Sequence, residues 1–462
     1  MQSIEILRSR MLPSGRRPKK AEPLTSHEIA EYASAIAMLG GYQESGRLFS
    51  RIQSTSDPEI LLLQAHSELA VFDYDRAQPL FERYLELIES PEDRQRAELR
   101  LLMCLMRGSK KNPDRADALL AQFFDGKSSK IPKPDRMYAG QMRVEFAYFF
   151  LKDSREALRL ARQLEQAYPD HNSTGLMLWI TLLSIRHGNQ APLQRSRIEA
   201  ERKRAIQEGN GYGLRQFDLY QSFILEDALA LQRYLFGTPY PEMRRLALER
   251  YGSPNSLPSS LIWSAGLPGE IFSKKSEKVR VFDVLLGTME GSRAMLRPND
   301  LPLTFLRTLT SDFYGRITEH EMHEKLYPGK DHVGPVSSQR LQTILHRLRT
   351  WLTRNSIPIH ILNQDRTFQI QPTNKVHFRL YNPEGSKPFH DMMTPEARES
   401  LQSLRNEFSE GHPFSSQDFV AILKVSPRTV LYRLKELNEK GLISSEGKGP
   451  SRRYRLVSSR LK

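Results

Sequence analysis

Cysteine is the scarcest residue type in this sequence, because Cys104 is the only one. A single thiol excludes an internal disulfide and a zinc site of four cysteines, and it is typical of a protein from a reducing compartment. The apolar run from Leu101 to Met106 surrounds it. We therefore expect this thiol to lie in a protein core.

Long apolar runs are also missing. The longest, from Gly175 to Ile185 with Trp179 inside, is shorter than the roughly 18 apolar residues that a transmembrane helix needs, so we expect a buried helix there. The first 20 residues carry six Lys and Arg but no apolar segment behind them, which argues against a secretory signal. These absences predict a cytoplasmic protein.

Proline and glycine are too few for a low-complexity chain, at 28 and 26 of 462 residues. With 39% hydrophobic and 26% charged residues, the composition is that of a folded soluble protein. The length exceeds what one hydrophobic core supports, and it predicts about three or four structural units.

The basic charge is concentrated toward the C-terminus. The chain carries a net charge of +14, of which residues 273–462 contribute +11, from 31 Lys and Arg against 20 Asp and Glu. Residues 1–20 add +5, whereas residues 21–272 carry about −2. Such asymmetry is expected of a nucleic-acid-binding, nucleoid-associated protein, although acidic lipids or ribosomes also attract a basic surface.

The sequence offers no motif for catalysis or metal binding. His320 and His323 are three residues apart, whereas a zinc-protease helix needs a spacing of four, so we expect a solvated helix there. The glycines from Gly209 to Gly213 follow a charged helical run instead of a strand, which favours a flexible loop over a nucleotide-binding turn. We therefore expect no enzyme activity, no cofactor and no metal.

Residues 24–251 have apolar residues at three- and four-residue spacing, which predicts an almost entirely helical region. Four segments share a small residue, namely Gly46, Ala77, Ala116 and Ala157, at steps of 31, 39 and 41 residues. These segments resemble degenerate tetratricopeptide repeats, in which a small residue lets the second helix of each pair approach the first. The resemblance implies a solenoid that binds a protein partner or mediates oligomerisation. An irregular helical domain is the alternative.

Composition changes divide the rest of the chain. Pro, Ser and Gly are frequent in residues 252–276, and a similar segment occupies residues 379–393, so we expect linkers there. The predicted order is a basic flexible tail (1–23), a helical-repeat domain (24–251), and two small α+β winged-helix domains (277–378 and 394–462). The expected fold class is therefore mainly α.

The first small domain begins with a predicted hairpin, in which residues 279–286 and 294–296 flank a turn. A helix marked by Leu303, Leu306 and Leu309 follows, and Thr318 then caps a second helix. A third helix is expected to begin at Ser337 or Ser338. Its apolar stripe is Leu341, Leu345, Leu348 and Leu352. Residues 357–362 and 367–370 predict a closing pair of strands.

This order resembles the winged-helix output domain of OmpR and PhoB type regulators, and Leu341 to Leu352 follows the rhythm of that family's recognition helix. The resemblance implies that the third helix enters the DNA major groove and that the closing hairpin, the wing, lies beside phosphate. The implied DNA-binding residues are Arg340, Thr343 and Arg347 on the helix and Arg366 on the wing. A winged fold used for dimerisation or partner docking is the alternative.

The C-terminal domain shows the same kind of pattern more sharply. Thr394 caps a first helix with Pro395 at its first position, Ser415 caps the second, and Ser426 with Pro427 opens the third. Within that third helix Val430, Leu434 and Leu437 form one apolar side. Residues 442–444 and 454–456 predict two strands around a loop rich in glycine and basic residues, and residues 424–462 carry 11 Lys and Arg against 3 Asp and Glu.

Residues 425–443 resemble the recognition-helix region of DeoR and MarR type regulators. The resemblance implies that the N-terminal half of the third helix reads DNA and that the basic wing straddles phosphates. The implied contacts are Ser426, Arg428, Thr429, Tyr432 and Arg433 on the helix, and Lys448, Ser451, Arg452 and Arg453 on the wing. A winged helix that contacts only proteins is the alternative.

Three functions follow, of which the first is preferred. The leading hypothesis is a bacterial transcriptional regulator that binds specific double-stranded DNA, with the helical repeats as a partner-binding or oligomerisation module. A replication initiator or partition protein with tandem winged helices is the second. The third is an adaptor in which both the repeats and the winged helices bind proteins.

Overall fold

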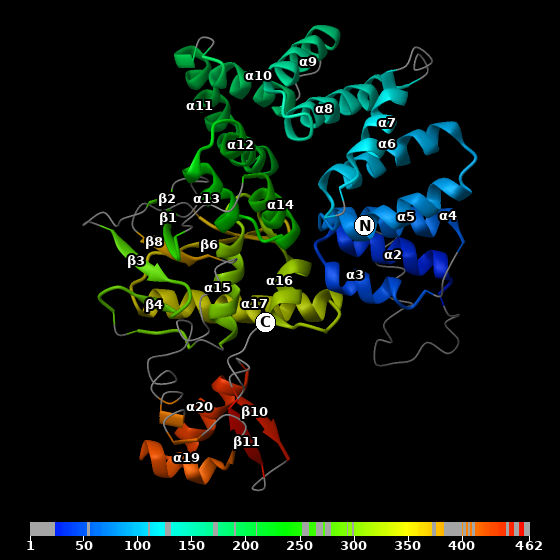
Figure 1. Cartoon of the computed structure of the whole chain (residues 1–462). Coiled ribbons are helices and arrows are strands. Elements are labelled where there is room, and N and C mark those ends of the chain that lie inside the picture. Colours follow the sequence, from blue (N-terminus) through cyan, green and yellow to red (C-terminus); the bar gives the residue numbers. More distant parts are fainter. Residues whose placement is uncertain are drawn as a thin grey trace. The chain divides into compact units, whose positions relative to one another are not determined.

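A computed structural model describes most of the chain (Figure 1). The described residues are 24–52, 56–109, 111–124, 131–169, 174–188, 191–208, 210–251, 258–264, 271–272, 279–292, 294–297, 300–371, 376–382, 400, 403–404, 407–408, 412–439, 443–447 and 452–456. They divide into two compact units, of which the first ends at Pro383 and the second begins at Glu384. The predicted N-terminal tail and the start of the helix expected at Thr394 lie outside the described residues.

The first unit begins with a long series of helices, coloured blue to green in Figure 1. Their bounds are α2 Ser26–Met38, α3 Tyr42–Phe49, α4 Pro58–Ala70, α5 Tyr74–Leu87, α6 Pro91–Arg107, α7 Pro113–Phe124, α8 Lys133–Phe149, α9 Ser154–Ala167, α10 Thr174–Arg186, α11 Ala191–Gln207, α12 Gly211–Ile224, α13 Ala228–Gly237 and α14 Pro241–Tyr251. Many begin at a side chain that accepts a backbone N–H, such as Thr25, Asp57, Ser90 and Asp153. Local capping chemistry therefore sets these starts.

Consecutive helices pack as pairs, and small residues lie at the pair contacts. Ala77 in α5, Ala116 in α7 and Ala157 in α9 are fully buried, as expected of a small residue between two helices. Gly46 does not belong to this set, because a Cβ atom there would meet nothing within 4 Å. The repeat spacing counted from Gly46 is therefore wrong by one residue, since the neighbouring Ser45 is buried in α3.

Two other predictions for the helical region are confirmed. The side chain of Cys104 is fully buried in α6, and burial raises the pKa of its thiol to about 12. The apolar run around Trp179 forms α10, in which the indole is buried. Among the described residues, no helix is long and apolar enough to cross a membrane.

Gly211 and Gly213 do not lie in the flexible loop that the sequence favours, because α12 begins at Gly211, and Gly209 lies outside the described residues. The side chain of Asn210 accepts the backbone N–H of Gly213 at 2.9 Å and caps the helix. A Cβ atom at Gly211 would lie 1.7 Å from the carbonyl oxygen of Tyr314. Close approach of two backbones, invisible in the local sequence, explains this glycine.

The second half of the first unit contains a five-stranded sheet with the strand order β2-β1-β8-β3-β4. The strands are β1 Ser260–Ser264, β2 Ile271–Phe272, β3 Arg280–Asp283, β4 Thr288–Met289 and β8 Val376–Tyr381. Strand β8 lies in the centre, antiparallel to β1 and parallel to β3. The predicted first strand is present as β3, but its hairpin partner is β4 at Thr288–Met289 and not residues 294–296, of which Met295 forms only an isolated bridge with Thr288.

Residues 252–276, expected as a linker, contain β1 and β2. Strand β1 is too short to stand out among prolines and serines, but the apolar residues Leu261, Ile262 and Trp263 are buried. The Trp263 ring stacks on Phe313 with 4.8 Å between ring centroids. One continuous hydrophobic core runs from the helices through this sheet, so tertiary packing makes one unit of what the sequence divides into two.

Candidate nucleic-acid interface

The first candidate module follows the five-stranded sheet in the chain. Its elements are α15 Leu301–Ser311, β5 Ile317–Thr318, α16 Glu319–Leu326, α17 Gly334–Arg354, β6 Ile361–Gln364 and β7 Thr367–Ile370. The strands form a separate sheet in the order β5-β7-β6. The three helices and the closing hairpin follow in the order that the sequence predicts, whereas the short strand β5 was not predicted.

Helix starts in this module are predicted correctly in one case and wrongly in another. The Thr318 side chain accepts the backbone N–H of Glu321 at 3.1 Å and caps α16, as expected. Helix α17 begins at Gly334, not at Ser337 or Ser338, because Pro335 fits the first turn of a helix. The Ser337 hydroxyl is buried and accepts the backbone N–H of Val333 at 2.8 Å, so it closes the turn from inside the helix.

Helix α17 has one buried side and one basic, exposed side. The predicted stripe from Leu341 to Leu352 is buried, and Arg340, Thr343 and Arg347 are exposed. The helix contains four arginines and no acidic residue. The Thr343 hydroxyl donates to the carbonyl oxygen of Gln339 at 2.9 Å. Two guanidinium groups are thus presented about two turns apart on one face.

The predicted wing of this module is a tight hairpin. Strands β6 and β7 are antiparallel, and Gln364 pairs with Thr367, which leaves Asp365 and Arg366 as a two-residue turn. Both turn residues have positive φ, 52° and 57°, as this kind of turn requires. Arg366 is exposed, and its carbonyl oxygen accepts the backbone N–H of Glu319 at 3.0 Å. The wing is therefore fastened to the start of α16.

His320 and His323 do not lie on a solvated helix, and that prediction is wrong. Both are buried in α16, and their rings lie 4.1 Å and 5.2 Å from the ring of His332, centroid to centroid. Burial and the nearby Arg340 lower the pKa of His323 to about 4, so this ring is neutral at physiological pH. No group of residues able to hold a metal occurs in the part of the chain that the structure describes.

The N-terminal helix pair covers the segment between α16 and α17. The Glu44 backbone N–H donates to the Glu324 carboxylate at 2.8 Å, and the Glu44 carboxylate accepts the His332 backbone N–H at 2.9 Å. Arg47 pairs with Asp331 at 2.7 Å. These contacts, missed by sequence reasoning, join residues almost 300 positions apart, and they explain why the histidines are buried.

Glu321 in α16 provides a test of this packing. Burial raises the pKa of the Glu321 carboxyl to about 7, from about 4.5 in an unfolded chain, and Asp312 adds to the rise. Because the pKa of this carboxyl is higher in the folded chain than in the unfolded one, its protonated form stabilises the fold fully below about pH 4.5. This contribution to stability is lost as the pH rises through 7. We expect Glu321→Gln to stabilise the protein by about 1–3 kcal/mol more at pH 8 than at pH 5.

Urea unfolding at both pH values measures this effect. Glu86→Gln is the matched control, because Glu86 lies on the exposed side of α5. That control should change the free energy of unfolding equally at pH 5 and pH 8. If Glu321→Gln also changed the free energy of unfolding equally at pH 5 and pH 8, that result would contradict the burial of this carboxyl.

The second unit holds the second candidate module. Its elements are β9 Pro413–Phe414, α19 Ser416–Leu423, α20 Pro427–Glu439, β10 Ile443–Glu446 and β11 Arg453–Leu456, with the sheet order β10-β11-β9. Strands, helices and their order correspond to those of the first module. Its core is small and includes Leu404, Phe414, Phe419 and Tyr454.

The predicted caps at Ser415 and Ser426 are confirmed. Ser415 and Asp418 form a reciprocal capping box at the start of α19. The Ser426 hydroxyl accepts the Thr429 backbone N–H at 3.2 Å at the start of α20. The left-handed Lys424, with φ of 51°, ends α19 and allows the sharp turn into α20.

The two sides of α20 also separate as predicted. Val430, Leu434 and Leu437 are fully buried. Ser426, Arg428 and Tyr432 are exposed, whereas Thr429 is half-buried. Arg433 differs from the prediction, because it is half-buried and its guanidinium donates to the Ser400 hydroxyl at 3.0 Å. Leu431 is exposed although its side chain is apolar, and the sequence analysis did not name it.

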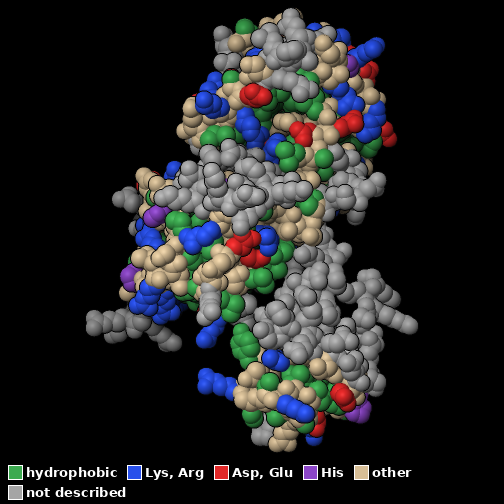
Figure 2. Space-filling view, turned by 90° about the vertical axis from the view of Figure 1, so that its left-hand side faces the viewer, with side chains coloured by type: hydrophobic (Ala, Val, Ile, Leu, Met, Phe, Trp, Pro, Cys, Tyr) green, Lys and Arg blue, Asp and Glu red, His purple; other side chains and the backbone are tan. Residues whose placement is uncertain are grey.

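The described part of the second wing is basic and exposed. Arg452 and Arg453 are both exposed, and the Arg455 side chain next to them pairs with Glu446 at 3.4 Å. Lys448 and Ser451, also predicted here, lie outside the described residues. Figure 2 shows Lys and Arg side chains projecting from the surface of this unit. The arginines at the base of the wing are thus free of the protein core.

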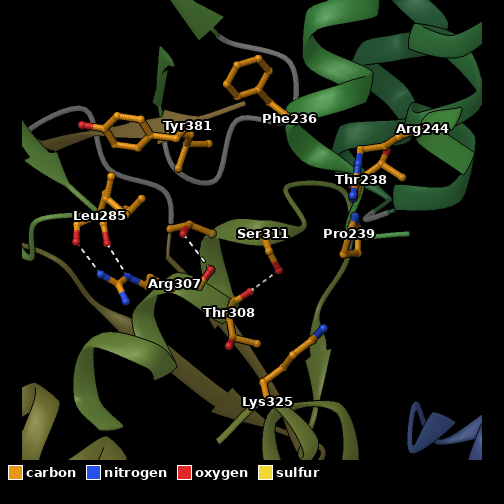
Figure 3. A pocket seen from close by; sticks show the side chains of 13 residues that line it. Phe236, Thr238, Pro239, Arg244, Leu285, Arg307, Thr308, Ser311, Lys325 and Tyr381 are labelled. Carbon is orange, nitrogen blue, oxygen red and sulfur yellow. Dashed lines mark hydrogen bonds between the residues drawn. The ribbon is translucent and has the colours of Figure 1, made fainter. Parts of the chain in front are cut away.

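A pocket of about 430 Å³ lies elsewhere, where α13, α15 and the turn after β3 meet (Figure 3). Arg307 points to this turn and donates to the carbonyl oxygens of Val284, at 2.8 Å, and Leu285. Arg244 donates to the Thr238 carbonyl oxygen at 2.8 Å. None of the described residues that line it is Asp, Glu, His or Cys. The two arginines of this pocket donate hydrogen bonds to backbone carbonyl oxygens, and the described lining residues include no acid–base pair.

Comparison with protein-family models, curated protein sequences and solved structures finds no match to this chain. What the chain does must therefore be argued from its own residues.

Proposed function

We propose that this protein is a sequence-specific double-stranded DNA-binding transcriptional regulator. The observation that carries the proposal is α20, which buries one side and turns Ser426, Arg428 and Tyr432 outward at its N-terminal half. A recognition helix inserts this half into the major groove. Arg452 and Arg453 are exposed on the adjoining hairpin. A winged helix of DeoR or MarR type uses the corresponding hairpin as its wing.

The first module supports the same function, because it presents a second candidate surface for contacting DNA. Arg340, Thr343 and Arg347 face one way on α17, and Arg366 is at the tip of the hairpin, as in a winged helix of OmpR or PhoB type. Arginine is the usual partner of guanine in the major groove, and threonine contacts bases or methyl groups. The packed helix pairs, read as tetratricopeptide-like repeats, serve as the partner-binding or oligomerisation module.

An adaptor function is the second candidate, and the contact of α3 with the α16–α17 segment favours it. Glu44 and Arg47 show that this part of the first module binds protein, here a segment of its own chain. A stable protein partner together with failure to retard any duplex would select the adaptor. Footprints confined to one origin-like locus would select a replication initiator or partition protein.

Selection of bound sequences from random duplex, with the full chain at a stated salt concentration, tests the proposal. A regulator enriches one motif, and dimeric binding shows as two half-sites about one helical turn apart. Sequences that remain random after several rounds would contradict specific recognition.

Salt dependence gives a prediction of its own. We expect the logarithm of the DNA affinity to fall linearly with the logarithm of salt concentration, with a slope of about −4 to −6, because each Lys or Arg at a phosphate releases about 0.9 counterion. Fluorescence anisotropy with the selected duplex between 50 mM and 300 mM salt measures this slope. A slope near zero would exclude a phosphate-bound wing.

A further inference from the structure

Two cavities of the first unit share lining residues and are together called here the central groove, which is bordered by α2, α4, α5, α6, α8, α10, α12, α13 and α14 (helices in Figure 1). The larger cavity has a volume of about 670 Å³, and the narrower one about 40 Å³. Both are lined by Tyr74, Arg107, Glu145, Tyr212 and Tyr220, among others. A volume of this size is typical of small-molecule sites.

Positive charge is in excess at the narrow end of the groove. The Glu145 carboxylate accepts hydrogen bonds from Arg107 at 2.7 Å and from the Tyr220 hydroxyl at 3.0 Å. Its other oxygen lies 4.0 Å from the Arg250 guanidinium. Two arginines thus share one carboxylate among the described lining residues. Burial lowers the pKa of Arg250, and Glu145 offsets this only in part.

Aromatic side chains occur both in the walls and at the mouth of the groove, among other polar and apolar lining residues. Tyr74 and Trp179 form buried walls. Tyr212 and Met38 stand at the mouth, where 59% and 78% of their surfaces are exposed. Aromatic rings lose little entropy when they stack on a flat ligand, and methionine adapts to it.

We propose that the central groove binds a small planar organic anion of the aromatic carboxylate class. The ligand carboxylate lies at the narrow end, where Glu145 is the one carboxylate that faces the guanidinium groups of both Arg107 and Arg250 among the described lining residues. The ring of the ligand lies between Tyr74 and Tyr212. The groove lies wholly within the first unit, so the proposal stands independently of DNA binding.

Calorimetric titration of the full chain without DNA tests this. The probes are salicylate, 4-hydroxybenzoate and indole-3-acetate, each paired with its neutral amide. We expect at least one acid to bind saturably with a Kd below about 1 mM, and its amide to bind about tenfold or more weakly, because the amide lacks the charge. Absence of saturable binding by all three acids, or equal binding of acids and amides, overturns the proposal.

A variant at the mouth of the groove locates the site. Tyr212→Ala removes an exposed ring that the fold does not need, and we expect it to weaken acid binding about fivefold. Leu151→Ala is the matched control, because Leu151 is 60% exposed and lies outside the groove. Equal affinity in wild type and Tyr212→Ala would place binding elsewhere and overturn the assignment.

Discussion

Replacing Arg428, Arg452 and Arg453 together by Ala should reduce the DNA affinity of the full chain about 100-fold or more at fixed salt. Arg428 lies at the exposed N-terminal half of α20, and loss of a base contact there costs about 1–3 kcal/mol. The two wing arginines lie where phosphate passes, so their removal should also lower the magnitude of the salt slope by about 2. Anisotropy titrations with the selected duplex measure both quantities.

A matched control separates a specific interface from loss of charge. Replacing Arg76, Arg96 and Arg159 by Ala removes the same charge from exposed positions on α5, α6 and α9. We expect that control to bind DNA within about twofold of wild type, because these positions lie on another unit. Equal losses in the two triple variants would refute α20 and its wing as the interface. Arg433 is left intact, since its bond to Ser400 makes it part of the fold.

Gly211→Ala should destabilise the first unit by about 3 kcal/mol or more, the upper range for overpacking a buried contact. The added methyl group would lie 1.7 Å from the Tyr314 carbonyl oxygen, and backbone on both sides leaves it nowhere to turn. The contact is also held by polar bonds, because the Tyr314 hydroxyl donates to Asp218 at 2.7 Å and Arg215 pairs with Asp312 at 2.5 Å. Urea unfolding followed by tryptophan fluorescence measures the loss.

Gly46→Ala is the control for this substitution. Nothing lies within 4 Å of a Cβ atom at Gly46, which is inside α3. Alanine is a better helix former, so we expect a gain of about 0.5–1 kcal/mol. Gly211 begins α12 against the backbone of Tyr314, whereas Gly46 lies inside α3 with open space around it. Similar effects of both substitutions would show that α12 and the segment at Tyr314 do not pack closely.

The amino-acid sequence by itself determined the features that depend on near neighbours. Caps at Thr318, Ser415 and Ser426 and the apolar spacing of Val430, Leu434 and Leu437 involve residues within two helical turns, so a local pattern suffices. For the same reason the exposed faces of α17 and α20, with Arg340, Arg347 and Arg428, were predictable. Exposure follows once the buried side of an amphipathic helix is known.

Tertiary structure alone decided what depends on distant partners. The sequence predicts a linker at β1 because the strand that pairs with it, β8, lies more than 100 positions away in the chain. The same holds for the burial of His323, for Gly211 against Tyr314, and for Arg107 and Arg250 about Glu145. A single sequence records which residues tend to be buried but not which of them meet, since many pairings satisfy the same pattern of apolar residues. Only the packed chain selects one of these pairings, and with it the central groove.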